Sequence, residues 1–434
     1  MRVMSTRGAD AATLTEAIAA GLARDGGLFL PPRPLPRPTG RPVSRSVADV
    51  ARWVLAPFCA DEPLGRELDA ICAESFDCDA PTRWLADDLG LLELFHGPTA
   101  AFKDFGARFL AACLARIAGP ATRTVLVATS GDTGAAVAAA FHGRAGFRVV
   151  VLYPDGLVSP RQAQQLGSFG GNVATYRVAG SFDDCQRLVK SAFADAGLRA
   201  RAGLTSANSI SLGRLLPQIA YWAKAALDAE AQGRAPVTFV VPTGNLGNAF
   251  ACLMAREMGL PIARVVLATN CNHTLTELLA TGRYEPRASI ATLANAMDVG
   301  APSNAERLLA WWPDVRATSA FLSAHSTHDE DIEVAIRNAH AEHGVVICPH
   351  TACGYDAALA ARGRRERGPL VIAATAHPAK FESIVQRCIG RAVEPPPALE
   401  VMLARPSSSL PLASDAGSLA RAIAAGLPGG ADRA

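Results

Sequence analysis

Residues 96–109 read HGPTAAFKDFGARF, and they place Lys103 between Phe102 and Phe105, just after a Gly-Pro pair. The apolar residues after Lys103 recur at helical spacing, so we expect a helix to begin here and the lysine to be buried. Burial lowers the pKa of a lysine, and the resulting neutral amine can form a Schiff base with an aldehyde. The alternative is a lysine that extends past two aromatic rings into solvent.

The sequence around this stretch alternates between predicted strands and predicted helices from Leu92 onward. A helix is expected to follow Lys103, and a longer one to span 212–227. The runs predicted as strands are 125–128, 149–152, 173–178, 237–241, 265–268, 345–347 and 370–374. Such alternation predicts an α/β fold with parallel strands, in which ligands bind beyond the carboxyl ends of the strands.

The two ends of the chain differ from this core. Residues 1–90 carry helical patterns interrupted by a proline-rich segment at 31–38, and residues 391–434 are first proline-rich, then serine-rich, then helical. We therefore expect a small, mostly helical N-terminal domain over 1–90, the main α/β core over 91–390, and a C-terminal helical extension over 391–434.

Composition excludes several classes of function. Half of the 434 residues are hydrophobic, and the formal net charge of +2 comes without a dense run of basic residues, so nucleic-acid binding has no support. The first residues lack the apolar core of a signal peptide, and no apolar run is long enough to span a bilayer. We expect a cytoplasmic protein with no membrane association.

A metal site is not expected either. The ten cysteines include no C-x-x-C pair, which argues against a zinc ribbon or a redox pair. His325 and His328, and likewise His340 and His343, have spacings that a metal could use, but neither pair has a third obvious ligand beside it. No G-x-S-x-G motif of a serine hydrolase is present.

Three polar turns follow predicted strands. The turn at 243–248 (TGNLGN) has two glycines before a helix, an arrangement in which backbone N–H groups and the helix dipole can hold a phosphate. The turn at 130–134 (SGDTG) brings two hydroxyls and a carboxyl to a helix start, and 206–209 (SANS) with Arg214 brings amide, hydroxyl and guanidinium groups to another. Taken singly, each turn is more commonly explained by packing or by helix capping than by ligand binding.

Together these motifs resemble the threonine synthases, a family of fold-type II pyridoxal phosphate (PLP) enzymes. The stretch 96–106 is similar to the family's cofactor-lysine motif, TSGDTGAA at 129–136 to its ring-binding turn, and PTGNLGN at 242–248 to its phosphate-binding turn. Further similarities, in the family's order, are STRG at 5–8, DGGLF at 25–29, NAMDV at 295–299, PHTA at 349–352 and TAHPAKF at 375–381. The resemblance implies two parallel-sheet α/β lobes, with 91–390 as the PLP-dependent catalytic core and 1–90 as the family's N-terminal domain.

The resemblance also implies roles for individual residues. Lys103 would bond to the cofactor aldehyde and act as the catalytic residue, Asp132 would face the ring hydroxyl, and Thr375 would face the pyridine nitrogen. The residues that would hold the cofactor phosphate are Gly244, Asn245, Leu246, Gly247 and Asn248. Those that would receive the substrate phosphate are Ser130, Thr133, Asn208, Ser209 and Arg214, with Lys380 as a further candidate.

The activity implied is conversion of O-phospho-L-homoserine and water into L-threonine and phosphate, by a monomer or homodimer. Two alternatives stay open. One is another fold-type II PLP lyase, such as a serine/threonine dehydratase or a phospho-amino acid lyase. The other is a non-catalytic anion-binding protein in which Lys103 is structural; it would have to maintain several polar turns without a ligand, at considerable cost in stability.

Overall fold

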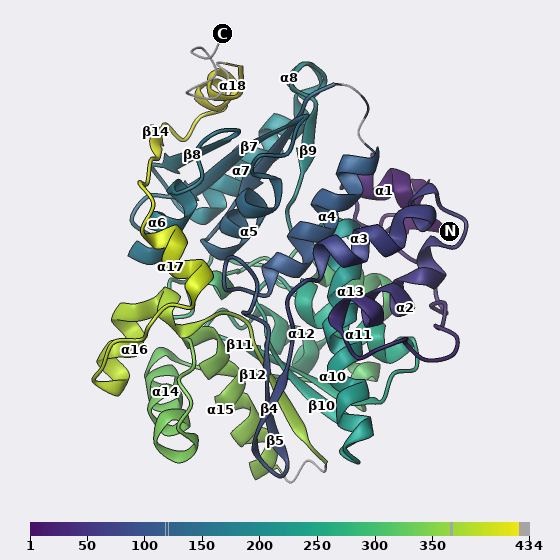
Figure 1. Cartoon of the computed structure of the whole chain (residues 1–434), viewed down its shortest axis with the longest axis vertical. Coiled ribbons are helices and arrows are strands. Elements are labelled where there is room, and N and C mark those ends of the chain that lie inside the picture. The colour runs from purple at the N-terminus through teal and green to yellow at the C-terminus, as the bar shows by residue number, and fades with distance from the viewer. Residues whose placement is uncertain (118, 120, 365–367, 425–434) are drawn as a thin grey trace.

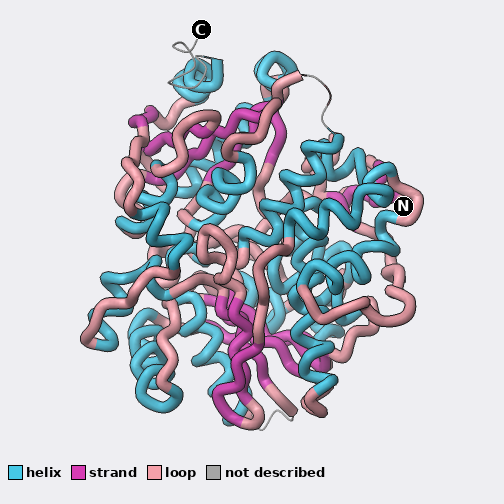
Figure 2. The backbone as a smooth tube through the Cα atoms, viewed as in Figure 1, coloured by secondary structure: helices cyan, strands magenta, loops and turns pink. Residues whose placement is uncertain are grey.

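The computed structural model describes residues 1–117, 119, 121–364 and 368–424. The two larger groups of strands lie toward opposite ends of the molecule, and a small third group lies near the N-terminus (Figure 2). The upper and lower lobes in Figure 1 are each built on one of the two larger sheets. The strand order confirms the predicted fold class of two parallel-sheet α/β lobes.

The upper lobe is built on a five-stranded sheet in the order β14-β8-β7-β6-β9, and every neighbouring pair is parallel. Helices α5 to α8 connect its strands, as parallel pairing requires. The strands are β6 (Arg123–Ala128), β7 (Phe147–Pro154), β8 (Val173–Val178), β9 (Leu204–Ser206) and β14 (Leu410–Leu412), and the helices are α5 (Asp132–Phe141), α6 (Pro160–Gly167), α7 (Phe182–Ala194) and α8 (Ala196–Ala202).

The lower lobe is built on a six-stranded sheet in the order β12-β11-β10-β13-β5-β4. Only the edge pair, β4 with β5, is antiparallel. The strands are β4 (Thr82–Ala86), β5 (Leu89–Glu93), β10 (Val237–Pro242), β11 (Ile262–Thr269), β12 (Leu322–Ser326) and β13 (Leu370–Ala374). Its helices are α11 (Gly247–Glu257), α12 (Thr274–Thr281), α13 (Ala305–Trp311), α14 (Asp329–His343), α15 (Pro349–Gly363) and α16 (Glu382–Ile389).

Helix α4 (Lys103–Ile117) runs through the centre of the molecule, beside the N-terminal domain (Figure 1). That domain contains α1 (Leu14–Ala20), α2 (Val47–Cys59) and α3 (Leu68–Ser75). It also contains a three-stranded antiparallel sheet of β1 (Arg2–Ser5), β2 (Ala11–Thr13) and β3 (Phe29–Leu30). Helix α2 packs on α10 (Ile219–Ala231) and α3 on α4, so the domain shares one hydrophobic core with the lobes.

Three expectations need correction. Residues 345–347 form no strand; Val345 and Ile347 are buried between α14 and α15, and a short apolar run does not distinguish a buried linker from a strand. The helix expected over 212–227 is interrupted at Pro217 by a 3₁₀ turn between α9 (Leu212–Leu215) and α10. The boundary expected at residue 90 falls inside the β4–β5 pair.

The C-terminal segment returns across both lobes. After α17 (Pro397–Leu403) the chain adds β14 to the upper sheet and then forms α18 (Ala416–Ala424), so the described part of this extension is not wholly helical. Figure 1 shows it in yellow, running from the lower lobe to the top of the upper one. Residues 425–434 lie outside the described part of the chain. No helix within the described ranges has both the length and the apolarity needed to cross a membrane.

Candidate active site

A pocket of about 970 Å³ contains the sequence-predicted site residues except Lys380. Strands from both sheets contribute, because Ser130 follows β6 and Thr243 follows β10, while Thr375 follows β13. All three turns extend the carboxyl ends of parallel strands, where α/β proteins bind ligands.

Lys103 is the first residue of α4 and faces this pocket. The turn before it is held by Asp104, whose carboxylate accepts bonds from the Thr99 backbone N–H at 2.9 Å and the Thr99 hydroxyl at 2.7 Å. Position 97 must be glycine here, because a Cβ atom would lie 2.5 Å from Asp104 Oδ2. The Phe102 N–H donates to the Thr375 carbonyl at 2.9 Å, which ties this turn to the end of β13.

The Lys103 amine is in an environment that favours its neutral form. Burial lowers its pKa to about 8; the Asp132 carboxylate opposes this effect, and the charges of Arg214 and Lys380 add to it. Its Nζ lies 5.6 Å from the centre of the Phe102 ring and makes no hydrogen bond within the described residues. The side chain is partly exposed rather than fully buried as expected, because it faces the pocket.

The turn at 243–248 leads directly into α11. Leu246 adopts a left-handed backbone with φ of 63°, and its N–H donates to Thr243 Oγ1 at 3.1 Å. The N–H groups of Gly244, Asn245, Gly247 and Asn248 have no hydrogen-bond partner among the described residues. Unpaired N–H groups at a helix start form an anion site, so the turn fits a phosphate group.

The side chains of this turn are fixed by its neighbours. Asn245 Nδ2 donates to Ser209 Oγ at 2.7 Å, and Asn245 Oδ1 accepts from the Ser303 N–H at 2.5 Å. Asn248 Oδ1 accepts from the Tyr221 hydroxyl at 2.6 Å, so this side chain is engaged with α10. At Gly244 an added Cβ would lie 2.7 Å from Met297 Cα, so the turn packs tightly against 295–297.

Asp132 is the first residue of α5 and is almost fully buried. Its Oδ1 lies 2.8 Å from Lys380 Nζ and accepts from Gln162 Nε2 at 3.0 Å. Burial opposes ionisation, but the charges of Lys380, then Lys103, keep the pKa of Asp132 well below its ordinary value. Asp132 is therefore a carboxylate in the pocket wall.

Arg214 is a buried cation that lacks a counter-ion. It is 2% exposed, and its Nη1 donates to the Ala207 carbonyl at 2.5 Å, but it makes no ion pair within the part of the chain described here. Burial lowers its pKa to about 10, so it remains charged at neutral pH. Ser130, Thr133, Asn208 and Ser209 line the same pocket. A buried guanidinium among hydroxyl and amide groups fits an anionic ligand.

Lys380 does not line the pocket, in contrast to the expectation of a substrate ligand. It is 1% exposed, and besides Asp132 it donates to the Thr99 carbonyl at 2.8 Å. The amine is committed to two protein groups in the wall behind the pocket. Sequence similarity placed it near the site but could not distinguish the wall from the cavity.

His350, for which the sequence motifs predicted no role, lines the pocket near the start of α15. Its Nε2 accepts from the Ala296 N–H at 3.0 Å, and its ring lies 4.8 Å from that of Phe381. Burial lowers its pKa to about 4, so the ring is neutral at physiological pH. Its position after a predicted strand was the available signal. The histidines weighed as metal ligands have other partners; His325, for example, bonds to Asp356.

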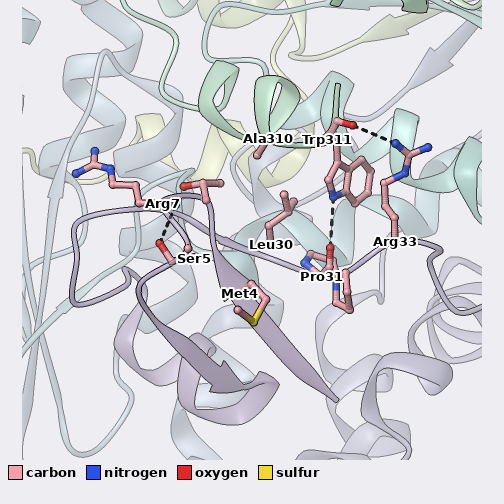
Figure 3. Close-up of a pocket in the computed structure, with 11 residues that line it drawn as sticks. Met4, Ser5, Arg7, Leu30, Pro31, Arg33, Ala310 and Trp311 are labelled. Carbon is pink, nitrogen blue, oxygen red and sulfur yellow. Dashed lines mark hydrogen bonds between the residues drawn. The ribbon is translucent and has the colours of Figure 1, made fainter. Parts of the chain in front are cut away.

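A second hollow, of about 600 Å³, lies between β1, β3 and α13 (Figure 3). Its polar groups bond to protein: Trp311 Nε1 donates to the Pro31 carbonyl at 3.3 Å, and Arg33 donates to the Trp311 carbonyl at 3.2 Å. Arg33 also pairs with Glu257 at 2.6 Å. We assign no ligand to it.

Comparison with known proteins gives the same class as the geometry. Residues 86–376 match the family model described as pyridoxal-phosphate dependent enzyme, residues 2–76 that of the threonine synthase N terminus, and residues 351–423 that of the threonine synthase C-terminal region. The chain is 39% identical to threonine synthase of Serratia marcescens over 426 residues, which cover 96% of this chain and 97% of that protein.

Two solved structures are also similar over nearly the whole chain. Threonine synthase of Escherichia coli superposes with a TM-score of 0.89 at 36% identity, covering 98% of this chain and 100% of that one. PLP-bound threonine synthase of Brucella melitensis gives 0.87 at 34% identity, with 98% of each chain covered. Fold and site define a PLP-dependent enzyme of fold-type II, and its cofactor is pyridoxal 5'-phosphate. Within that class, the chain belongs to the threonine synthase family.

Proposed function

We propose that this protein converts O-phospho-L-homoserine and water into L-threonine and phosphate, and that Lys103 performs the proton transfers. One observation carries the proposal. A single pocket is lined by the Lys103 amine, by the N–H groups of Gly244, Asn245, Gly247 and Asn248, and by Arg214. Among the residues described, the amine and these N–H groups have no hydrogen-bond partner, and Arg214 has no ion-pair partner. The N–H groups form a first anion site, which suits the phosphate of the cofactor, and Arg214 forms a second, which suits that of the substrate.

The residues around the first site would hold PLP. Gly244, Asn245, Leu246, Gly247 and Asn248 would bind its phosphate, mainly through backbone N–H groups that have no hydrogen-bond partner among the described residues. The Asn245 side chain is bonded to Ser209 and Ser303. Asp132 would face the ring hydroxyl, and Thr375 would face the pyridine nitrogen. A neutral threonine, unlike a carboxylate, does not force the ring nitrogen to be protonated, and this favours elimination and replacement over transamination. When bound, PLP supplies an electron sink that acidifies the substrate carbons.

The residues around the second site would bind the leaving phosphate. Arg214 contributes a buried positive charge, and the polar groups of Ser130, Thr133, Asn208 and Ser209 contribute hydrogen bonds. The Lys103 amine, which a pKa of about 8 leaves partly neutral near pH 7, would accept the Cα proton and then move a Cβ proton. Phosphate leaves from Cγ, and water adds at Cβ.

The test measures phosphate and threonine produced from O-phosphohomoserine, with and without added PLP, in wild type and in Lys103→Ala. We expect the wild type to form both products in equal amounts, and the variant to form neither while its circular dichroism is unchanged. Lys190→Ala, which removes the other lysine lining the pocket, is the matched control and retains turnover. Release of ketoacid from serine in place of threonine formation would instead indicate a dehydratase.

We also infer that the enzyme is cytoplasmic and that it is a monomer or a homodimer. Sedimentation at several protein concentrations tests the oligomeric state.

A further inference from the structure

Lys380 is buried behind the pocket and joins two elements that flank Lys103. It lies in the 3₁₀ turn Pro378–Phe381, and its Nζ is 2.8 Å from both Asp132 Oδ1 and the Thr99 carbonyl oxygen. Asp132 begins α5 in the upper lobe, and Thr99 belongs to the turn that leads into α4. A single amine therefore links the upper lobe to the loop that carries Lys103.

The segment around Lys380 is itself held in place. Its carbonyl accepts from Ser159 Oγ at 2.8 Å, and the neighbouring Ala379 carbonyl accepts from Arg161 at 2.8 Å. Arg161 also pairs with Glu382 at 2.7 Å. Lys380 thus has little freedom to swing into the pocket, and its ammonium is shared between a carboxylate and a carbonyl.

The ion pair between Lys380 and Asp132 affects the charge that surrounds Lys103. The groups that act electrostatically on Lys103 are Asp132 from α5, Arg214 from α9 and Lys380 from the 3₁₀ turn, and His350 from α15 also faces it. Asp132 is the carboxylate among these groups. If Lys380 did not neutralise it, its negative charge would favour the protonated form of Lys103. Arg214 Nη1 donates to the Ala207 carbonyl, and Arg214 forms no ion pair with Asp132 among the described residues.

We propose that Lys380 is a positioning residue that neutralises Asp132 and fixes the turn at Thr99, so that the Lys103 amine has no counter-ion of its own. This inference rests on the proposed role of Lys103. It replaces the expectation that Lys380 binds the substrate phosphate. The two roles predict different results. Loss of a residue that binds the substrate phosphate would weaken substrate binding alone, whereas loss of a positioning residue would change Lys103 before any substrate is present.

The experiment titrates Lys103 in the full-length protein after removal of PLP. Labelling with trace acetic anhydride, read by mass spectrometry of the Lys103 peptide across a pH series, reports the fraction of free amine at each pH. The pKa of Lys103 in the wild type is expected at about 8. In Lys380→Met we expect this pKa to rise by one unit or more, which corresponds to about a tenfold loss of free Lys103 amine near neutral pH.

Two further variants make the result specific. Asp132→Asn should move the Lys103 pKa below the wild-type value, because the charge of Lys380 is then no longer balanced. Asp132→Asn combined with Lys380→Met should return it toward wild type. Lys224→Met is the matched control, since it also removes a buried lysine paired with an aspartate, Asp228 at 2.8 Å, but on α10 away from the pocket. It should leave the titration of Lys103 unchanged.

Each outcome decides the proposal. An unchanged Lys103 titration in Lys380→Met, together with a raised KM for O-phosphohomoserine, would overturn it in favour of substrate binding. Should Lys380→Met fail to fold, the shift in Asp132→Asn carries the test, and Lys380→Arg should keep the wild-type titration. The labelling needs no bond between PLP and Lys103, so failure of the proposed function and failure of this inference are distinguishable.

Discussion

Asn245 donates a 2.7 Å hydrogen bond from its Nδ2 to Ser209 Oγ, and this bond joins the turn proposed for the cofactor phosphate to the turn proposed for the substrate phosphate. Asn245 Oδ1 and its backbone carbonyl are bound by Ser303 and Asn304. The two anion sites are therefore parts of one hydrogen-bonded unit. A substitution in either turn should therefore affect ligand binding at the other turn as well.

We expect Ser209→Ala to weaken both PLP and O-phosphohomoserine binding, each by about tenfold, the effect of losing about 1.4 kcal/mol. The reason is that the Asn245 amide loses its acceptor. Ser303→Ala is the control, because the bond from position 303 uses the backbone N–H. Fluorescence titration with PLP and steady-state kinetics measure the two constants. Loss of substrate affinity alone would show that the turns act independently.

Gly244→Ala should lower PLP affinity and also destabilise the fold by roughly 1–3 kcal/mol. Its Cβ would lie 2.7 Å from Met297 Cα, and backbone atoms cannot yield as a flexible side chain can. Gly247→Ala is the matched comparison, with its nearest atom at 3.4 Å and a smaller loss of stability expected. Urea unfolding of both PLP-free variants checks this order. Equal losses would contradict it.

Arg214→Gln should raise KM for O-phosphohomoserine by about 30-fold or more, because the buried charge that faces the substrate phosphate is lost. Inorganic phosphate should raise the Tm of the wild type, and this rise should disappear in the variant. The ligand-free variant should be at least as stable as the wild type, because the substitution removes a buried charge that has no ion-pair partner in the described part of the chain. A variant that keeps the response to phosphate would place the anion elsewhere.

His350 should make the protein less stable in acid. Its folded pKa of about 4 lies below the ordinary 6.5, so the unfolded chain binds the proton more readily. The neutral ring therefore contributes about 3 kcal/mol to the free energy of unfolding. This contribution is fully present above pH 6.5 and is lost as the pH falls toward 4. His350→Gln should flatten the pH dependence of unfolding over that range. An unchanged slope would contradict a neutral His350.

Much of the site could be predicted from local sequence. A lysine at a helix start beside two phenylalanines, and polar turns after apolar strands, are patterns within short windows. Parallel strands then bring the ends of β6, β10 and β13 to one pocket, as the predicted alternation requires. Lys103 is only partly buried because it lines the pocket. A short window of sequence does not show that a cavity lies on one side of a residue.

Other features depend on long-range packing. Lys380 and Asp132 are far apart in sequence, and nothing in either motif indicates that they pair. The bond between His350 and Ala296 joins the start of α15 to the 3₁₀ turn at 295–297, which are distant in sequence. Residues 345–347 carry strand-like side chains, but they pair with no strand of the described chain and are buried between the adjoining helices. Each of these depends on which elements meet, information that short patterns lack.

The central claim is that the Lys103 amine bonds covalently to PLP. Reduction of the PLP-loaded protein with borohydride, followed by digestion and peptide mass spectrometry, locates the bond directly. We predict one pyridoxyl-phosphate adduct, on the peptide that contains Lys103. An adduct on Lys380 or Lys190 in its place, or protein that stays colourless and carries no adduct, would contradict the account.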